Sequence, residues 1–220
     1  GNFHYITTGM DITLSCADNE PHPSGARELC TRVSFGYPDV QHSEWECIES
    51  PEGEITFNFK EESEHNLEYY CIDNVGKVSD THTQYYKVDD TPPIITKTIE
   101  GPSFAPEGSS CDQEATQDSE NICYLDAATR ILVEAVDPAP HPVDDVTCKW
   151  RYAVSEEGYS DDFGDWNSTF PIWFPQESYH TLQIVCEDAL GNSTEDTEYF
   201  QVDHTPPVTT KEYGKPLYTS

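Results

Sequence analysis

Basic residues are scarce in this sequence. It contains 11 Lys and Arg against 42 Asp and Glu, which gives a formal net charge of −31. Because binding to nucleic-acid phosphates needs a cluster of Lys and Arg, this shortage excludes nucleic acid as a partner. The excess of acid is typical of a solvated, self-repelling surface, and it also offers carboxylates that can bind cations. Both interpretations stay open at this stage.

Long apolar runs are also rare, and Met, Leu and Ala are scarce. A membrane-spanning helix needs about 20 consecutive apolar residues, and no apolar run comes close to this length. The sequence therefore predicts no membrane span. The chain has a single Met, and its less polar stretches are rich in Thr, Val, Tyr, Phe and Ile. These residue types favour strands over helices.

The sequence lacks the short motifs that identify common enzymes. We find no Gly-x-Ser-x-Gly nucleophile elbow, phosphate-binding loop, His-Glu-x-x-His zinc motif or dinucleotide fingerprint. Among 42 acids, a pair of carboxylates does not by itself indicate a glycosidase. The His of the two Pro-His-Pro motifs, His22 and His141, could act as a base or ligand, but such a loop His more often packs locally. We therefore expect no catalytic residues and no enzymatic activity.

What the sequence does contain is one phrase that occurs twice, at 67–93 and at 182–207. Each copy has a β-type stretch, an Asp-x-x-Gly turn, a second β-type stretch and a final Thr-Pro-Pro. This order predicts an antiparallel hairpin, and the Pro-Pro cannot continue a central strand, so it marks the exit from a domain. A repeated hairpin with a repeated exit predicts two tandem domains.

Other positions extend the repeat to nearly the whole chain. Tyr5 and Ile12 each have an identical residue 119 positions later, and residues from His65 to Cys71 have counterparts 115 positions later. About seven short strands per repeat predict an all-β chain of two tandem immunoglobulin-like β-sandwich domains, stapled by disulfides. The expected boundaries are domain 1 at 1–93, a linker at 94–103, domain 2 at 104–207, and a tail at 208–220 that connects to a next repeat or subunit.

Eight cysteines, four per domain, predict disulfides formed in an oxidising exterior. Metal binding by thiolates is the alternative, but the long spacings contain no Cys-x-x-Cys pair. We aligned Cys30 with Cys148 and Cys71 with Cys186, which predicts the equivalent bridges Cys30–Cys71 and Cys148–Cys186.

The other four cysteines have no counterparts in the repeat. Cys16 and Cys47 are both missing from the second domain, which predicts that they bond to each other. Cys111 and Cys123 both lie in an insertion that the first repeat lacks, and we expect them to close it.

Acidic residues in the expected loops make calcium a possible cofactor. Calcium takes six to eight oxygen ligands from carboxylates and loop carbonyls, and loops near a domain boundary can supply them. The alternative is that these acids only form turns and linker caps, without an ion. The candidate ligands are Asp18, Asp73, Asp89, Asp90, Asp137, Asp188 and Asp203.

Two further sets of residues suggest carbohydrate. Asn167 and Asn192 each begin an Asn-Ser-Thr sequon, so both are candidate glycosylation sites. The four tryptophans could form an exposed aromatic platform, or they could fill the cores of the sandwiches. They are Trp45, Trp150, Trp166 and Trp173.

The pattern C-x-D-x-x-G-(K/N)-x-S followed by V-D-x-T-P-P resembles the immunoglobulin-like tandem repeats of large archaeal and bacterial cell-surface proteins. Lys77 departs from the commoner Gly-Asn of the turn, which the second repeat keeps as Gly191-Asn192. The matching residues are Asp73, Gly76, Ser79, Asp89, Thr91, Pro92 and Pro93, then Asp188, Gly191, Asn192, Asp203, Thr205, Pro206 and Pro207. The resemblance implies surface-layer units, stalks, adhesins or extracellular filaments, many of them glycosylated or calcium-dependent, without catalysis of their own.

We therefore expect a structural protein at the cell surface. The segment after the second Thr-Pro-Pro, joined to residue 1, would give the same kind of passage as the one between the domains. The expected partners are copies of the chain or neighbouring repeats, arranged end to end. The alternative is an adhesin or carbohydrate-binding module of a larger surface protein, with surface glycans or other cell-surface proteins as partners.

Overall fold

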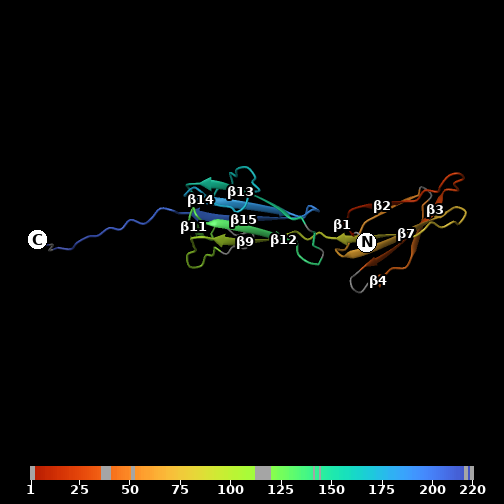
Figure 1. The fold of residues 1–220 in the computed structure, drawn as a ribbon, viewed down its shortest axis with the longest axis horizontal. Helices are drawn as coiled ribbons and strands as arrows, with labels where there is room; N and C mark the ends of the chain where they lie inside the picture. The colour runs from red at the N-terminus through yellow and green to blue at the C-terminus, as the bar shows by residue number, and fades with distance from the viewer. Residues whose placement is uncertain are drawn as a thin grey trace. The chain divides into compact units, whose positions relative to one another are not determined.

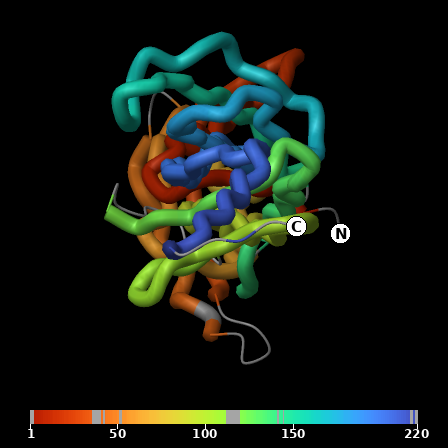
Figure 2. The backbone as a smooth tube through the Cα atoms, turned by 90° about the vertical axis from the view of Figure 1, so that its left-hand side faces the viewer, coloured from red at the N-terminus to blue at the C-terminus, as the bar shows by residue number. Residues whose placement is uncertain are grey.

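The computed structural model describes residues 3–35, 41–50, 53–111, 120–140, 142–143, 145–215 and 218. In these residues all regular secondary structure is β (Figure 1). The chain forms two compact units. The first comprises 1–95, 135–148 and 185–194, and the second comprises 96–134, 149–184 and 195–220. Figure 2 traces the same backbone in colours that run from red at the N-terminus to blue at the C-terminus.

The first sequence repeat forms two sheets. Its strands are β1 (Phe3–Ile6), β2 (Ile12–Ser15), β3 (Ala26–Phe35), β4 (Gln41–His42), β5 (Glu46–Glu49), β6 (Glu54–Phe57), β7 (Glu64–Asp73) and β8 (His82–Val88). The larger sheet has the order β1-β8-β7-β3-β4, with β5 also paired to β3, and β2 pairs with β6 in the smaller sheet. Leu14 of the smaller sheet belongs to one buried cluster with Leu29, Leu67 and Val88 of the larger sheet. The two sheets therefore form a β-sandwich around this core.

The second repeat also has a large and a small sheet. Its strands are β9 (Ile94–Glu100), β10 (Ser103–Phe104), β11 (Tyr124–Leu125), β12 (Arg130–Val136), β13 (Thr147–Ser155), β14 (Tyr179–Glu187) and β15 (Ser193–Val202). The order of the larger sheet is β10-β11-β15-β14-β13, and β12 pairs with β9. Ile131, Leu182 and Phe200 are buried core residues. The predicted linker at 94–103 differs from the structure, because 94–100 forms β9.

The Asp-x-x-Gly turns have the same geometry in both repeats. The Gly76 N–H donates to the Asp73 carbonyl at 3.1 Å, and the Gly191 N–H donates to the Asp188 carbonyl at 3.3 Å. Both glycines have a positive φ, +82° and +93°, which side chains other than hydrogen disfavour. The repeated phrase therefore encodes a hairpin turn.

A buried histidine also occupies equivalent places in the two repeats. His65 stacks on Phe59 with ring centroids 4.1 Å apart, and His180 stacks on Phe174 at 4.3 Å. The His180 ring nitrogen Nε2 lies 2.9 Å from the Gln176 carbonyl. Burial lowers the pKa of His180, although the bond to the Gln176 carbonyl acts in the opposite direction. These histidines are core residues.

Two of the predicted disulfides are wrong. The structure joins Cys16 to Cys71 and Cys30 to Cys47, instead of Cys16–Cys47 and Cys30–Cys71. The other pairs are Cys111–Cys123 and Cys148–Cys186. In the register of β3 and β7, Cys30 lies opposite Tyr70, while Cys71 lies opposite Leu29. Because neighbouring residues of a strand point to opposite faces, Cys30 and Cys71 face away from each other.

The error comes from a one-residue slip in the repeat alignment. Arg32 bonds to Glu68, and Arg151 bonds to Gln183, which makes Arg32 and Arg151 equivalent residues of β3 and β13. They lie 119 positions apart, so the offset of the upstream residues continues through this strand. The counterpart of Cys148 is then Leu29, which is the residue opposite Cys71.

Removing Cys16–Cys71 should cost more stability than removing Cys30–Cys47. The two bridges span 55 and 17 residues of sequence. Each should contribute about 2–4 kcal/mol to the free energy of unfolding, and the longer loop about 1 kcal/mol more than the shorter one. Non-reducing peptide mapping, followed by urea unfolding of Cys16→Ala/Cys71→Ala and Cys30→Ala/Cys47→Ala, measures both points. The matched control is Cys111→Ala/Cys123→Ala in the second unit. Recovery of a peptide that links Cys30 to Cys71 would contradict the observed pairing.

Candidate metal site

Three of the seven predicted acidic residues come together in one cluster. Asp89 follows β8, Asp137 follows β12, and Asp188 follows β14 in the second hairpin turn. One carboxylate oxygen from each lies within 4.8 Å of those of the other two. All three residues belong to the first compact unit. We call this cluster the aspartate triad.

Hydrogen bonds from nearby donors hold the three carboxylates in place. Asp188 Oδ1 accepts the N–H groups of Leu190 and Asn192 at 2.7 and 2.9 Å. The Asn192 side-chain amide donates to Asp188 Oδ2 at 2.9 Å and to the Asp89 carbonyl at 3.2 Å. Asp137 Oδ2 accepts the Val143 N–H. Asn192, which stands where the first repeat has Lys77, thus links two members of the triad.

The triad is buried and carries no compensating positive charge within the described part of the chain. Asp89 and Asp188 are 0% and 4% exposed, and Asp137 Oδ1 is a buried oxygen without a hydrogen-bond partner among the described residues. No Lys, Arg or His of the described ranges forms a salt bridge with it. Burial is the main cause that raises the pKa of Asp89 to about 6; the nearby Asp137 and Glu62 contribute to this rise, and the hydrogen bond from the Thr91 N–H opposes it. A cation or a proton would relieve this repulsion.

The donors of the triad fit a hard metal ion. Every ligand atom in the cluster is a carboxylate oxygen, the type that calcium and magnesium prefer, and the cluster contains no sulfur or imidazole. Three carboxylates supply part of the six to eight oxygens that surround a calcium ion. Within the described ranges no hydrogen bond to Asp137 Oδ1 would have to break for this oxygen to bind an ion. The triad could therefore hold a metal ion.

Asp18 and Asp73 lie in a different place, where both line one hollow together with Lys77. Asp18 accepts backbone N–H bonds from Ser24 and Gly25, and the bond from Ser24 contributes most to lowering its pKa. Asp73 Oδ1 accepts the Lys77 N–H at 2.7 Å. These two residues are the counterparts of Asp137 and Asp188 in the first repeat.

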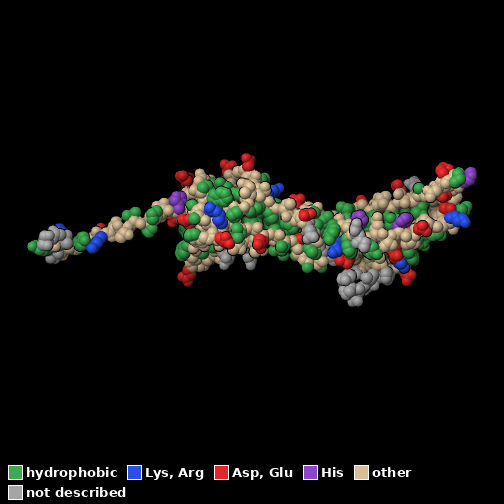
Figure 3. All heavy atoms as spheres, in the orientation of Figure 1, with side chains coloured by type: hydrophobic (Ala, Val, Ile, Leu, Met, Phe, Trp, Pro, Cys, Tyr) green, Lys and Arg blue, Asp and Glu red, His purple; other side chains and the backbone are tan. Residues whose placement is uncertain are grey.

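The remaining two predicted ligands also lie outside the triad. Asp90 is exposed and accepts the Thr8 N–H at 2.9 Å. Asp203 is exposed, and its Oδ1 accepts the Thr205 N–H at 3.0 Å. Asp203 follows Val202 and precedes Thr-Pro-Pro with the same spacing as Asp89, so it is the counterpart of Asp89. More widely, Figure 3 shows Asp and Glu side chains spread over the visible surface, with few Lys and Arg.

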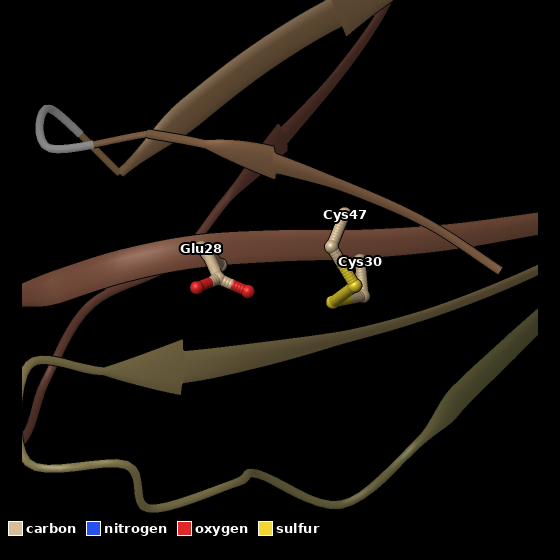
Figure 4. Close-up of side chains that lie close together, drawn as sticks. All are labelled: Glu28, Cys30 and Cys47. Carbon is tan, nitrogen blue, oxygen red and sulfur yellow. A yellow bond between two sulfur atoms is a disulfide. The ribbon is translucent and has the colours of Figure 1, made fainter.

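A second group of residues has the spacing of a metal site but not its chemistry. Glu28, Cys30 and Cys47 place one oxygen and two sulfur atoms close together (Figure 4). The two sulfur atoms are bonded to each other as a disulfide. Since metal ligation needs thiolates, this group is not a metal site while the disulfide is intact.

The four tryptophans have different environments. Trp150 is 6% exposed and donates its indole N–H to the Thr169 carbonyl at 2.9 Å, while Trp45 packs edge-on against Tyr70. Trp166 and Trp173 are 40% and 44% exposed. The Arg151 guanidinium lies 4.4 Å from the ring centroid of Trp166, which covers part of that ring. The four rings therefore divide between core and surface roles.

Trp150 and Trp173 also line a surface hollow of about 320 Å³ with Tyr152. Asn167 and Thr169 supply polar atoms at its wall. The sequon residue Asn167 is exposed, whereas the amide of the other sequon residue, Asn192, donates hydrogen bonds within the triad. Of the other predicted loop residues, His22 is exposed, and His141 lies outside the described residues.

Comparison with known proteins gives only distant structural likenesses. A scan against protein-family models finds no match, and a search of curated protein sequences finds no significant match. Among solved structures, the fibronectin(III)-like modules of CbhA from Clostridium thermocellum match at 12% identity and a TM-score of 0.36. The match covers 94% of this chain and 95% of that chain.

The fold and the disulfides show the general type of protein. The chain is all-β, with tandem immunoglobulin-like sandwiches and four disulfides, which confirms the predicted fold class. The disulfides indicate an oxidising environment. Among the described residues no helix is long and apolar enough to span a bilayer.

Calcium should stabilise the first unit through the triad. At a free calcium concentration of 100 times Kd, binding to the folded state alone adds about 2.7 kcal/mol to the free energy of unfolding. Asp137→Asn should abolish most of this gain, because it removes a charge and a ligand. The matched control is Asp90→Asn, at the neighbouring exposed acid, and this variant should retain the stabilisation by calcium. Thermal melts with calcium and with EDTA measure the effect, and equal loss in both variants would contradict the site.

Without metal, the first unit should become more stable on acidification from pH 7 to pH 5. The pKa of Asp89 is about 6 in the folded state, against an ordinary value of 3.8, so between these values the folded state binds more protons. The free energy of unfolding therefore falls as pH rises through about 6. Asp89→Asn should remove this part of the pH dependence in EDTA. An unchanged pH profile in that variant would show that other groups cause it.

Proposed function

We propose that the chain is a structural, non-catalytic protein of the cell exterior, and that its immunoglobulin-like modules join end to end through calcium sites of the triad type. The aspartate triad carries this proposal. Its members are drawn from both sequence repeats, since Asp89 precedes the first Thr-Pro-Pro while Asp137 and Asp188 come from loops of the second repeat.

The chain also carries the parts for another such site. Asp18 and Asp73, the counterparts of Asp137 and Asp188, line one hollow of the first unit. Asp203, the counterpart of Asp89, is exposed beside the second Thr-Pro-Pro. When the first repeat of a following copy meets Asp203, the same three acids come together. In a longer chain the following module would be the next repeat.

Lys77 makes this second junction chemically different from the triad. It stands where the second repeat has Asn192, the residue whose amide donates to Asp188 and to the Asp89 carbonyl. A Lys side chain brings donors and a positive charge, which compensates part of the carboxylate repulsion. The junction between copies therefore depends less on calcium and more on ionic strength than the triad does.

Self-association of the chain tests this proposal. At high protein concentration and low salt we expect end-to-end oligomers by sedimentation and electron microscopy. Asp203→Asn should weaken the association at least about tenfold, equivalent to about 1.4 kcal/mol. Asp161→Asn, at an exposed loop position, is the control of equal charge change. A chain that stays monomeric at all concentrations, or associates equally well with Asp203→Asn, would contradict it.

A second candidate function is carbohydrate binding, which the hollow lined by Trp150, Tyr152 and Trp173 favours. Aromatic faces provide large apolar contact area, and Asn167 and Thr169 offer hydrogen-bonding groups beside them. A glycan array with wild type and Trp173→Ala separates this function from the structural one. A glycan attached at Asn167 would itself occupy the hollow and exclude this role.

A further inference from the structure

The second unit contains a buried group of three charged side chains that the proposed function does not use. Lys97 lies on β9, and Asp196 and Glu198 lie on β15. Lys97 Nζ contacts Asp196 Oδ2 and Glu198 Oε1. The three side chains are 4%, 0% and 2% exposed, so water has almost no access to them.

The pattern of β15 explains how two acids come to be buried. Alternate residues of the strand, from Asp196 through Glu198 and Phe200 to Val202, are buried. The acids therefore share the inward face of the strand with core residues. In the first repeat the corresponding residues of β8, counted back from the aligned Val88 and Val202, are His82 and Gln84. The buried acids are therefore specific to the second module.

Burial favours the neutral form of Lys97. Desolvation lowers the pKa of Lys97. The hydrogen bond to Asp196 and the negative charge of Asp196 act in the opposite direction. One amine and two carboxylates, if all were ionised, would also leave a net negative charge in the core, which is costly. Transfer of a proton from the ammonium to a carboxylate gives an uncharged amine beside an uncharged carboxylic acid and one remaining carboxylate. These are the species that amide formation requires.

We propose that Lys97 and Glu198 join through an intramolecular amide bond, with Asp196 as the proton carrier. The Lys97 Nζ lone pair attacks the Cδ carbon of protonated Glu198, and Asp196 takes a proton from the nitrogen. Asp196 then gives this proton to the departing hydroxyl. One C–N bond forms, one C–O bond breaks, and one water molecule leaves, with no change of oxidation state.

Position and solvent exclusion both favour this reaction. Groups held together in a fold react with effective concentrations of about 10⁵–10⁸ M when they are well oriented, and the dry core keeps water away from the product. The Asp196 carboxylate contacts Lys97 Nζ directly, so it is placed to accept a proton from that nitrogen. Because β9 and β15 belong to different sheets, the bond would join the two sheets of the module covalently.

The mass of the intact chain tests the proposal without any substitution. After reduction of the disulfides, the wild-type chain should be lighter than its sequence by one water molecule. A protease digest should contain one peptide pair joined between Lys97 and Glu198, identified by fragmentation. A wild-type chain with the full sequence mass would overturn the proposal and leave a buried salt bridge only. A link that ends on Asp196 would overturn the assignment of the two acids.

Variants then test the roles of the residues. Lys97→Arg and Glu198→Ala should both have their full sequence mass after reduction, and so should Asp196→Asn if it folds. Complete crosslinking in Asp196→Asn would overturn its role as proton carrier. Lys87→Arg provides the control, because Lys87 lies 3.6 Å from Glu64 with both side chains about one-fifth exposed. It should lose one water exactly as the wild type does, and loss of the crosslink in this variant would contradict the assigned site.

Discussion

Buried carboxylates impose the strongest constraint on this molecule. In a chain with 42 acids and 11 Lys and Arg, most acidic side chains can stay in water, where their charge costs little. Asp89, Asp188, Asp196 and Glu198 do not, since each is at most 4% exposed. Each must be compensated locally, because an isolated charge in the interior costs several kcal/mol. The rest of the architecture determines which compensation is available.

The two buried groups solve the same electrostatic problem in different ways. The triad is built from loop and turn residues, and backbone N–H groups of these loops point at the carboxylates of Asp137 and Asp188. One oxygen, Asp137 Oδ1, has no hydrogen-bond partner among the residues that the structure describes. Such a group suits an external cation. Asp196 and Glu198 lie on a regular strand, where the backbone amides are committed to the sheet, and there a side chain from the other sheet, Lys97, supplies the compensation. Loop acids thus favour a ligand, and strand acids favour an internal partner.

Local sequence signals predicted much of the fold. The Asp-x-x-Gly turns, the strand-forming stretches and the Thr-Pro-Pro exits act within a few residues, so they could be recognised without knowing which strands pair.

The disulfides could not be assigned correctly, because a slip of one residue between Leu29 and Cys30 moves a side chain to the other face of the sheet. The shared offset of Arg32 and Arg151 was the available signal, since it continues the upstream alignment through this strand. For the candidate site, sequence selected seven acids, and only the three-dimensional arrangement separated Asp89, Asp137 and Asp188 from the rest.

Lys97 and its partners show why such a group escapes sequence analysis. Asp196 and Glu198 alternate as residues of a solvent-facing strand do, and in a chain this acidic they look like part of the surface. Phe200 and Val202 continue the same alternation along the strand, and only these two apolar residues reveal that this face is the core. A strand that carries acids and large apolar residues on one face must pair the buried acids with a base, or the fold loses stability. Such a pattern therefore predicts a buried Lys or Arg nearby. The same logic applies to Lys77, which lines one hollow with Asp73 and stands where the second repeat has the neutral Asn192. In both places one basic residue changes what an acidic cluster needs from its surroundings.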